Sequence, residues 1–509
     1  MNNDRAASLS SPKAGGRASS DPISEGAPEP VIFEYSQPGR AAFSLPPEPE
    51  GLPSLDEAIP PQHLAESPPP LPEVSERDLV AHFTRLAHRQ YSVDAGAYPL
   101  GSCTMKYNPK VGERIALMDG FSGMHPACDP ALAQGALEVM YLLERALCEV
   151  TGMARASLQP PAGAAGELTG LLVMTAYQKA RGQERRIVLI PDSAHGTNPA
   201  SVTLAGCEAV EIPSDEEGMV DISSLEKAVS DSVVGLMVTN PNTLGLFEKN
   251  IVRIAEIVHE AGGLLYYDGA NLNAILGVCR PGDMGFDVVH INLHKTFATP
   301  HGGGGPGAGP VAVSEALVEF LPGPLVERDV ERDHFYLENP SRSIGRVHSY
   351  FGNFGVLLRA LVYILANGPA GLREVAETAV LNARYLQALV SDAFPPAYPG
   401  PCMHEFVTTA SSIKKRTGVR AMDIAKRLLD KGFHAPTVYF PLIVEEALMI
   451  EPTETETPET LRALANALLE VAREAESDPE LVKGAPHTTP VRRPDEARAG
   501  NPKTRRLSW

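Results

Sequence analysis

Three reactive side chains follow apolar, β-branched runs of the kind that form buried strands. Asp268 ends one such run, Lys295 lies just after the next one along the chain, and His195 follows an earlier one. Parallel strands gather chemistry at their carboxyl ends. We therefore expect a carboxylate, an amine and an imidazole to share one site.

An aspartate and a lysine in this arrangement are the two groups that pyridoxal 5'-phosphate (PLP) requires. A lysine amine forms a Schiff base with its aldehyde, and partial burial helps that amine to lose its proton. An aspartate pairs with the ring nitrogen and keeps it protonated, so that the ring accepts electrons. A lone aspartate at this place is more often a helix cap, and a lone lysine more often lies on the surface. The pair together favours PLP, and Ala270 would let the ring lie close to the strand.

A phosphate site is predicted upstream of the pair. Gly163 and Ala164 precede an apolar helix expected at 168–180. Small residues that open a helix expose backbone N–H groups and the positive end of its dipole, which suits a phosphate. Taken alone, the pattern fits an ordinary turn into a helix equally well.

Other candidates for cofactor contacts are a histidine and two asparagines. His195 could stack on the ring or meet a substrate carboxylate, and a purely structural role is the alternative. Asn240 and Asn242 follow the apolar run 233–239. Either amide could hydrogen-bond the ring hydroxyl or serve a turn. A glycine run at 302–305 would allow close packing beside the lysine.

The elements that must position these residues alternate between strand and helix. Ile251, Ile254 and Val258 share one face at helical spacing, between two of the apolar runs. Buried strands that alternate with amphipathic helices predict an α/β fold with a large, mostly parallel sheet. The expected strands cover 186–191, 207–213, 233–239, 263–268, 287–292 and 310–313.

A smaller C-terminal αβ domain is predicted to follow. It should contain helices at 377–394 and 421–433 and a strand at 403–410. Prolines between Pro46 and Pro72 exclude a helix there and predict extended chain, before a helix at 76–90. The predicted segments are a disordered tail 1–30, an arm and pocket-covering segment 31–110, a large domain 111–369, the small domain 370–480 and a basic tail 481–509.

Composition excludes several classes of protein. The net charge of -19 argues against nucleic-acid binding, and six spread cysteines without a CxxC pair argue against a disulfide scaffold or a zinc site, so no metal is expected. The sequence contains no run of about 18 apolar residues, so no membrane span is predicted. The first residues have no apolar core and so no secretory signal, and a plain tail is preferred to a transit peptide. These features predict a cytoplasmic protein.

Long blocks of the sequence resemble the glycine decarboxylase P-proteins, the PLP enzymes of the glycine cleavage system. The resemblance extends from about Val31 to the C-terminus and is strongest to subunit 2 of the split bacterial form. The blocks that carry it are 98–110, 192–201, 266–275, 292–307, 343–360, 401–407, 435–456 and 485–491.

The resemblance implies the aspartate-aminotransferase type of PLP fold, fold type I. It implies that Lys295 is the Schiff-base lysine, Asp268 the pyridinium partner and His195 the ring-stacking histidine. Further residues expected to contact PLP are Gly163, Ala164, Ala270, Asn242 and His294, the last as a phosphate contact. The segment 98–110 should fold over the mouth of the pocket.

The activity implied is that of an oxidoreductase that decarboxylates glycine and transfers the aminomethyl group to the lipoyl group of the H-protein, releasing CO2. A homologous subunit 1 would complete a two-plus-two heterotetramer. Ala165 departs from the family, whose members usually carry His or Gln there, and this change could weaken substrate placement.

Two other readings remain open. One is a different PLP enzyme of the same fold, such as a cysteine desulfurase or an aminotransferase. An aminotransferase would need an arginine for the substrate carboxylate, for which Arg416 or Arg420 is available. The other is a non-catalytic scaffold subunit.

Overall fold

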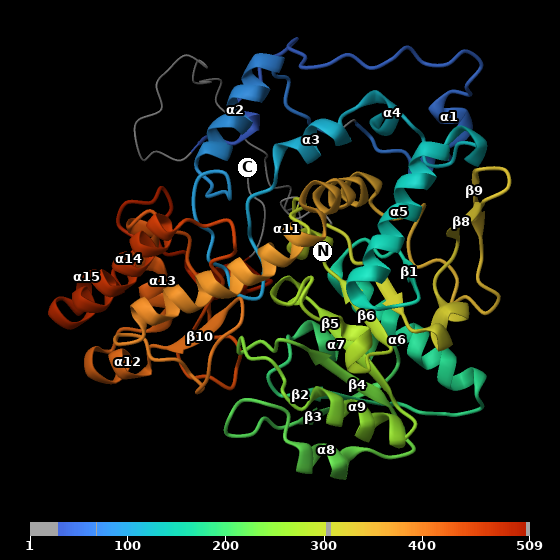
Figure 1. Ribbon diagram of the computed structural model, residues 1–509. Coiled ribbons are helices and arrows are strands. Elements are labelled where there is room, and N and C mark those ends of the chain that lie inside the picture. Colours follow the sequence, from blue (N-terminus) through green and yellow to red (C-terminus); the bar gives the residue numbers. More distant parts are fainter. Residues whose placement is uncertain (1–28, 68, 302–306, 505–509) are drawn as a thin grey trace, which may run out of the picture. The chain divides into compact units, whose positions relative to one another are not determined.

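The computed structural model describes residues 29–67, 69–301 and 307–504 (Figure 1). The chain forms two compact units, one of Met1–Tyr91 with Thr488–Trp509 and one of Ser92–His487. All the candidate site residues belong to the second unit. Most of the predicted tail 1–30 and the glycine run 302–305 lie outside the described residues.

The first unit is built around helix α2 (Glu76–His88), which confirms the helix predicted at 76–90. The Ser75 side chain caps it by accepting from the backbone N–H of Asp78. The Glu29 carboxylate binds Arg85 at 2.7 Å and so ties the start of the arm to this helix. The other elements of this unit are η1 (Ile32–Tyr35), α1 (Leu55–Ala58), η2 (Pro61–His63) and α16 (Glu496–Gly500).

The exclusion of any helix between Pro46 and Pro72 is wrong for one turn. Helix α1 forms in a stretch that has no proline between Pro53 and Pro60. Ser54 precedes it, and the Glu57 carboxylate accepts from the Ser54 N–H at 3.0 Å. A proline-free gap with a capping pair is long enough for a single helical turn.

A seven-stranded sheet forms the centre of the second unit, in the order β1-β7-β6-β5-β4-β2-β3. Only β7 is antiparallel to its neighbours, so the predicted mostly parallel sheet is confirmed. All six predicted strands are present, whereas the three-residue β1 was not predicted. The strands are β1 (Arg155–Ser157), β2 (Ile187–Pro191), β3 (Glu208–Ile212), β4 (Val233–Thr239), β5 (Leu264–Gly269), β6 (Val288–Ile291) and β7 (Val311–Val313).

Both faces of the middle of this sheet are covered, which explains why β2, β4 and β6 are almost entirely apolar. Tyr266 and Tyr267, neighbours on β5, are fully buried in two different hydrophobic clusters. One cluster includes α6 and the other includes α5, α9 and α11. The predicted face of Ile251, Ile254 and Val258 on α9 is buried. The helices of this region are α3 (Lys110–Ala116), α4 (Asp119–Ser122), α5 (Gln134–Thr151), α6 (Gly163–Ala180), α7 (Thr197–Leu204), α8 (Ile222–Ala228), α9 (Ile251–Glu260) and α10 (Leu293–Thr296).

A smaller antiparallel sheet, in the order β10-β12-β11, follows toward the C-terminus. The strand predicted at 403–410 and the helix predicted at 421–433 are both present, as β10 and α13. Their cluster of buried residues is separate from those of the large sheet. The elements here are β10 (Phe406–Thr409), β11 (Thr437–Val438), β12 (Ala447–Ile450), α12 (Ser411–Thr417), α13 (Ala421–Asp430), α14 (Pro458–Ser477) and α15 (Pro479–Lys483), and a hairpin of β8 (Leu325–Asp329) and β9 (His334–Glu338) precedes them.

Helix α11 (Phe354–Val390) joins the two regions of this unit, and Figure 1 shows it passing from the large sheet toward β10 and α13. Its second half is the helix predicted at 377–394. It breaks at Gly368, whose φ of 63° is left-handed, just before Pro369. The predicted boundary between the two domains falls at this break.

By length and composition α11 could cross a membrane, contrary to the expectation that no segment would qualify. Its apolar stretch includes Arg359, and this charged residue is why a search for uninterrupted apolar runs does not find the stretch. Leu357 and Leu361 pack in the core of the large sheet, so a core helix explains the composition. The absence of a membrane span stays a prediction.

The core of the large sheet can be tested on α5. Leu143 is fully buried, whereas its neighbour Leu142 is 44% exposed. Replacing Leu143 with Ala should lower the free energy of unfolding by about 2–5 kcal/mol, because it leaves a cavity. Leu142→Ala should change it by about 0.5 kcal/mol or less. Urea unfolding of both variants measures this, and equal effects would contradict the described packing.

Candidate cofactor site

Lys295 lies on the short helix α10, directly after strand β6. Its Nζ donates a hydrogen bond to the backbone carbonyl of Ser102 at 2.7 Å. Ser102 belongs to the segment 98–110, so the structure places that segment against the lysine, as we predicted. Lys106 of the same segment is buried and binds Asn273, Glu454 and the carbonyl of Thr296.

Asp268 lies near the end of β5, buried and paired in register with His290 on β6. Its carboxylate accepts from the side-chain amide of Asn198 and from the backbone N–H of Ala270, both at 3.0 Å. The His290 Nε2 lies 3.3 Å from Oδ1. Burial alone would raise the pKa of Asp268, but these three partners hold that pKa below its usual value. Asp268 is therefore ionised, as a partner of a pyridinium nitrogen must be.

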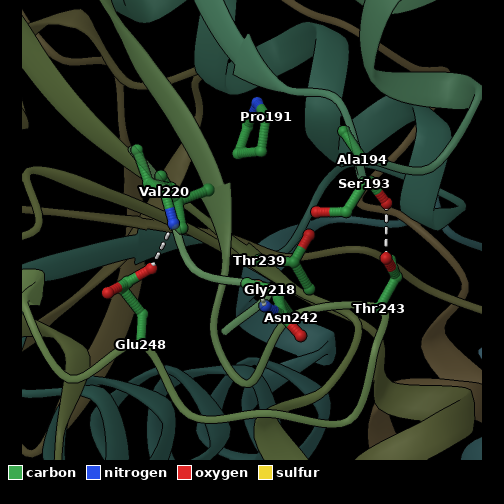
Figure 2. A pocket seen from close by; sticks show the side chains of 10 residues that line it. Pro191, Ser193, Ala194, Gly218, Val220, Thr239, Asn242, Thr243 and Glu248 are labelled. Carbon is green, nitrogen blue, oxygen red and sulfur yellow. Dashed lines mark hydrogen bonds between the residues drawn. The ribbon is translucent and has the colours of Figure 1, made fainter. Parts of the chain in front are cut away.

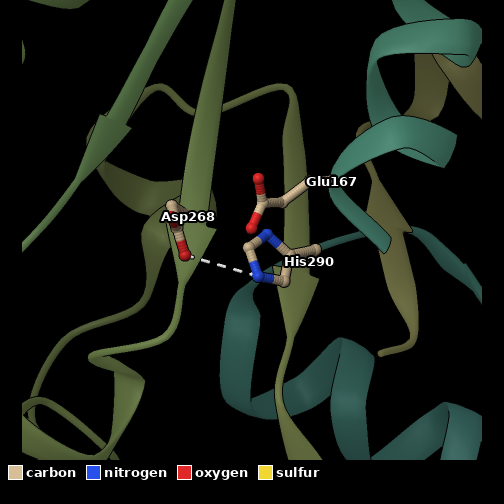
Figure 3. A group of neighbouring side chains, drawn as sticks. All are labelled: Glu167, Asp268 and His290. Atoms are coloured by element: carbon tan, nitrogen blue, oxygen red, sulfur yellow. Dashed lines mark ion pairs between the residues drawn. The ribbon is translucent and has the colours of Figure 1, made fainter. Parts of the chain in front are cut away.

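A second carboxyl group, Glu167 on α6, points toward Asp268 and His290 (Figure 3). Burial, and then the charge of Asp268, raise the pKa of Glu167 to about 8. The Asn198 amide donates to both carboxyl groups at 3.0 Å, and Ser201 adds a bond of 3.2 Å to Glu167. The proton thus stays on Glu167 while the charge stays on Asp268.

His290 connects Asp268 to a buried tyrosine. Its Nδ1 lies 2.9 Å from the hydroxyl of Tyr266. Burial lowers the pKa of His290, so the ring is neutral and carries one proton. The Tyr266 hydroxyl also lies 3.4 Å from the carbonyl of Gly166, to which it can donate. Nε2, the other ring nitrogen of His290, faces the Asp268 carboxylate.

His195 lies just beyond β2, in the neighbourhood of Lys295 and Asp268. Its Nδ1 accepts from the backbone N–H of Thr197 at 3.2 Å, and Phe440 is an edge-on neighbour at 5.5 Å. The residue is exposed, yet neighbouring protein atoms desolvate the ring. This desolvation, together with Lys295, lowers the pKa of His195, so the ring is neutral at pH 7. A neutral ring with an open face suits stacking on an aromatic cofactor.

The predicted phosphate site is the start of α6. Gly163 is its first residue, and a Cβ there would lie 2.5 Å from Oδ1 of Asn292, so only glycine fits. The first N–H groups of a helix have no partner within it, and the preceding Ala162 supplies no side-chain cap. Within the described part of the chain, the N–H groups of Gly163 and Ala164 are therefore open to an anion.

His294 and Ala165 flank this region. Burial, then His301 and Lys295, lower the pKa of His294 to about 3. Its Nδ1 accepts from the N–H of Ala308 at 3.4 Å, so His294 could offer a phosphate one neutral hydrogen bond but no charge. Ala165 is half-buried on the first turn of α6 and has no polar group to offer there.

The two candidate asparagines differ in their bonds. Asn242 uses its amide to close a turn, donating to the carbonyl of Gly218 at 2.8 Å and accepting from Leu244 and Leu246. Asn240 accepts from the N–H of Glu248, but its Nδ2 is buried without a partner in the described residues. The bonds therefore favour Asn240, rather than the predicted Asn242, as a donor to a ligand.

The cavity beside Asn242 is not the cofactor site. Figure 2 shows it between Pro191, Gly218 and Glu248, with the carboxylate of Glu248 bound to the N–H of Val220. Its volume of about 10 Å³ holds no more than one water molecule.

Several site residues were missed by sequence reasoning. Glu167, Asn198, Ser201 and His290 all lie within or beside segments that carried the prediction, yet nothing in the spacing pairs them. A polar residue inside an otherwise apolar run, such as His290 in 287–292, was the available signal.

Two groups of titratable residues close enough to share an ion occur in the described chain, Glu167 with Asp268 and His290, and His404 with Glu405 and Glu451.

Of the two candidate arginines for an aminotransferase, one has its guanidinium in an ion pair. Arg416 pairs with Glu476 at 2.6 Å on exposed chain. Arg420 precedes α13, and its backbone N–H donates to Asp423. The described contacts of these two arginines do not include Lys295.

Comparisons with known proteins show the family to which the chain belongs. Residues 375–487 match the family model "Glycine dehydrogenase, C-terminal domain", and 164–323 match "Aminotransferase class-V". Probable glycine dehydrogenase (decarboxylating) subunit 2 of Caldanaerobacter subterraneus is 56% identical over 92% of this chain and 96% of its own. The Thermotoga maritima protein of that name is 56% identical over 92% and 98%.

Solved structures show the same fold. Glycine decarboxylase (P-protein) in an inhibitor-bound form has a TM-score of 0.71 and 25% identity, over 84% of this chain and all of its own. A cysteine desulfurase from Escherichia coli has a TM-score of 0.55 at 16% identity, over 77% of this chain and 98% of its own. The second likeness concerns the fold alone.

The pKa of Glu167 gives a test in the cofactor-free protein. Its pKa is about 8 when folded and ordinarily 4.5, so between these values unfolding releases a proton. The folded state should therefore lose a few kcal/mol as pH rises from 5 to 8. Glu167→Gln should remove this part of the slope, whereas Glu184→Gln, at an exposed position, should not. Thermal unfolding across this pH range measures it, and an unchanged slope in Glu167→Gln would contradict the buried proton.

Proposed function

The chain belongs to the glycine dehydrogenase (decarboxylating) subunit 2 family, and from this premise we propose that it decarboxylates glycine with PLP carried on Lys295. The aminomethyl group passes to the lipoyl group of the H-protein and CO2 is released. The observation that carries the proposal is Asp268, a buried carboxylate kept ionised by three partners beside the strand end that presents Lys295. The family and its fold make the protein a PLP-dependent enzyme.

The described residues fit PLP, and each part of it has a partner in the proposal. Asp268 would face the ring nitrogen and His195 the ring face, with Ala270 close below. The N–H groups of Gly163 and Ala164 would take the phosphate, with His294 as a neutral neighbour. The unpartnered Nδ2 of Asn240 would donate to the ring hydroxyl. When bound, PLP supplies an electron sink for the breaking C–C bond.

The protein's own contribution is to fix charge and exclude water. Asp268 stays ionised because Asn198, Ala270 and His290 surround it. Glu167 holds its proton, so no second negative charge competes at this place. The segment around Ser102 lies over Lys295 and covers that side of the site.

The alternatives are weaker on specific grounds. An aminotransferase needs an arginine at the substrate carboxylate, and of the two candidates Arg416 is paired with Glu476 on exposed chain. A scaffold subunit has no use for a lysine and a buried ionised aspartate at adjoining strand ends.

The partners follow from the family. The name subunit 2 implies a subunit 1, and we propose a two-plus-two heterotetramer that acts on the H-protein in the cytoplasm. The arm before α2 is the proposed contact with subunit 1, because it combines prolines with exposed apolar residues such as Phe43 and Leu52.

The role of Asp268 is tested by substitution. Asp268→Asn keeps the shape but removes the charge, so glycine–CO2 exchange with H-protein and subunit 1 should fall by about a hundredfold or more. Asp287→Asn is the matched control, because Asp287 binds the N–H of Leu265 at the opposite end of β5. Circular dichroism should show both variants folded. Near-normal exchange by a folded Asp268→Asn variant would overturn the assigned role.

The role of the arm is tested by truncation. A chain that begins at Glu76 should form a smaller assembly with subunit 1 than the full chain does, because it lacks the proposed contact. Gel filtration with light scattering measures the mass of both mixtures. An assembly of undiminished stoichiometry would rule the arm out.

A further inference from the structure

Ser102, whose carbonyl accepts the Lys295 amine, adopts an unusual backbone conformation. Its φ is 64°, in the left-handed region that a residue with a side chain rarely occupies. A strained residue of this kind persists only where its surroundings hold it. The bonds around Ser102 therefore show what fixes the carbonyl in place.

The main support of Ser102 is Glu405, a fully buried residue just before β10. One carboxylate oxygen of Glu405 accepts from the Ser102 N–H at 2.8 Å, and the other accepts from the Asn271 amide at 3.0 Å. Asn271 also donates to the carbonyl of Pro241 at 2.9 Å. Glu405 thus links the loop over the lysine to the end of β5, three residues beyond Asp268.

The peptide before Ser102 is held as well. The carbonyl of Gly101 accepts from the Thr437 hydroxyl at 2.7 Å, and its N–H donates to the carbonyl of Met449 at 3.3 Å. A Cβ on Gly101 would lie 2.3 Å from the Met449 side chain. With these groups engaged, the remaining carbonyl of Ser102 points at Lys295.

We propose that Glu405 is a positioning residue for Lys295, which it serves by fixing the Ser102 carbonyl as a resting acceptor for the free lysine amine. This inference rests on the proposed function, in which an incoming amine displaces Lys295 from the cofactor. The Ser102 carbonyl then receives the displaced amine and keeps it beside the ring until it is needed again. The amine must also leave this acceptor before it can attack an electrophile, so the bond slows the reactions of the resting lysine.

The test measures the reactivity of Lys295 in the cofactor-free protein. Wild type and variants are acetylated at low reagent concentration at one fixed pH, and peptide mapping gives the rate at Lys295 relative to exposed Lys179. Glu405→Gln puts an N–H group where one of the two donors points, so it must break a bond to Ser102 or Asn271. Lys295 should then react about tenfold faster, as expected for the loss of one hydrogen bond.

The matched control is Glu248→Gln. Glu248 is also buried and also accepts backbone N–H groups on both oxygens, from Val220 at 2.9 Å and Asn250 at 3.1 Å, but away from the lysine. It should leave the relative rate at Lys295 unchanged. A folded Glu405→Gln variant with the wild-type rate, or an equal increase in Glu248→Gln, would overturn the proposal.

Two further variants keep the test decisive. Thr437→Val removes only the bond to Gly101, so it should fold and accelerate labelling by a smaller factor. Ser102→Gly in the Glu405→Gln background should restore part of the slow rate, because glycine adopts a positive φ without strain. No acceleration in the first, or no recovery in the second, would contradict a role through the Ser102 peptide. The labelling experiment needs neither PLP nor glycine. A result that contradicts the role of Glu405 can therefore be told apart from a result that contradicts the proposed function.

Discussion

A negative charge on Asp268 is the constraint on which the whole site depends. Burying a carboxylate is costly unless hydrogen bonds replace its water, and here they come from Asn198 on α7 and from the backbone N–H of Ala270, while the His290 ring on β6 lies 3.3 Å away. The parallel strands β2, β5 and β6 bring these groups together near the carboxyl ends of the strands. The fold therefore stabilises in advance the charge that a protonated ring nitrogen needs.

The protons around this charge are arranged to preserve it. Glu167 shares the Asn198 amide with Asp268 and remains protonated, so two adjacent carboxyl groups carry a single charge. His290 and His195 are neutral because burial lowers the pKa of each. On the other side, the loop at Ser102 supplies a carbonyl rather than a charge to Lys295. Asp268 thus keeps its charge while the titratable groups that contact it stay neutral.

The fold of the large sheet could be predicted from the sequence, because its central strands are buried on both faces and so appear as apolar runs. Asp268 and Lys295 could be predicted as well, since each lies at or just after the end of such a run. It could not pair Asn198 with Glu167, or Glu405 with Ser102, because those contacts join segments far apart in the chain. The choice between Asn240 and Asn242 depends on which side-chain amide makes the hydrogen bonds that close the turn, and only the folded loop shows this. The helical turn of α1 was missed because the prediction followed the many prolines around it and ignored the short proline-free stretch in which it forms.

The central claim, that this chain carries PLP on Lys295, is tested most directly by the absorption spectrum of the purified protein with PLP, before and after borohydride. The account predicts the band of lysine-bound PLP, its loss on reduction, and a single labelled peptide that contains Lys295. Absence of the band both with and without subunit 1, or a label on a different lysine, would contradict the account.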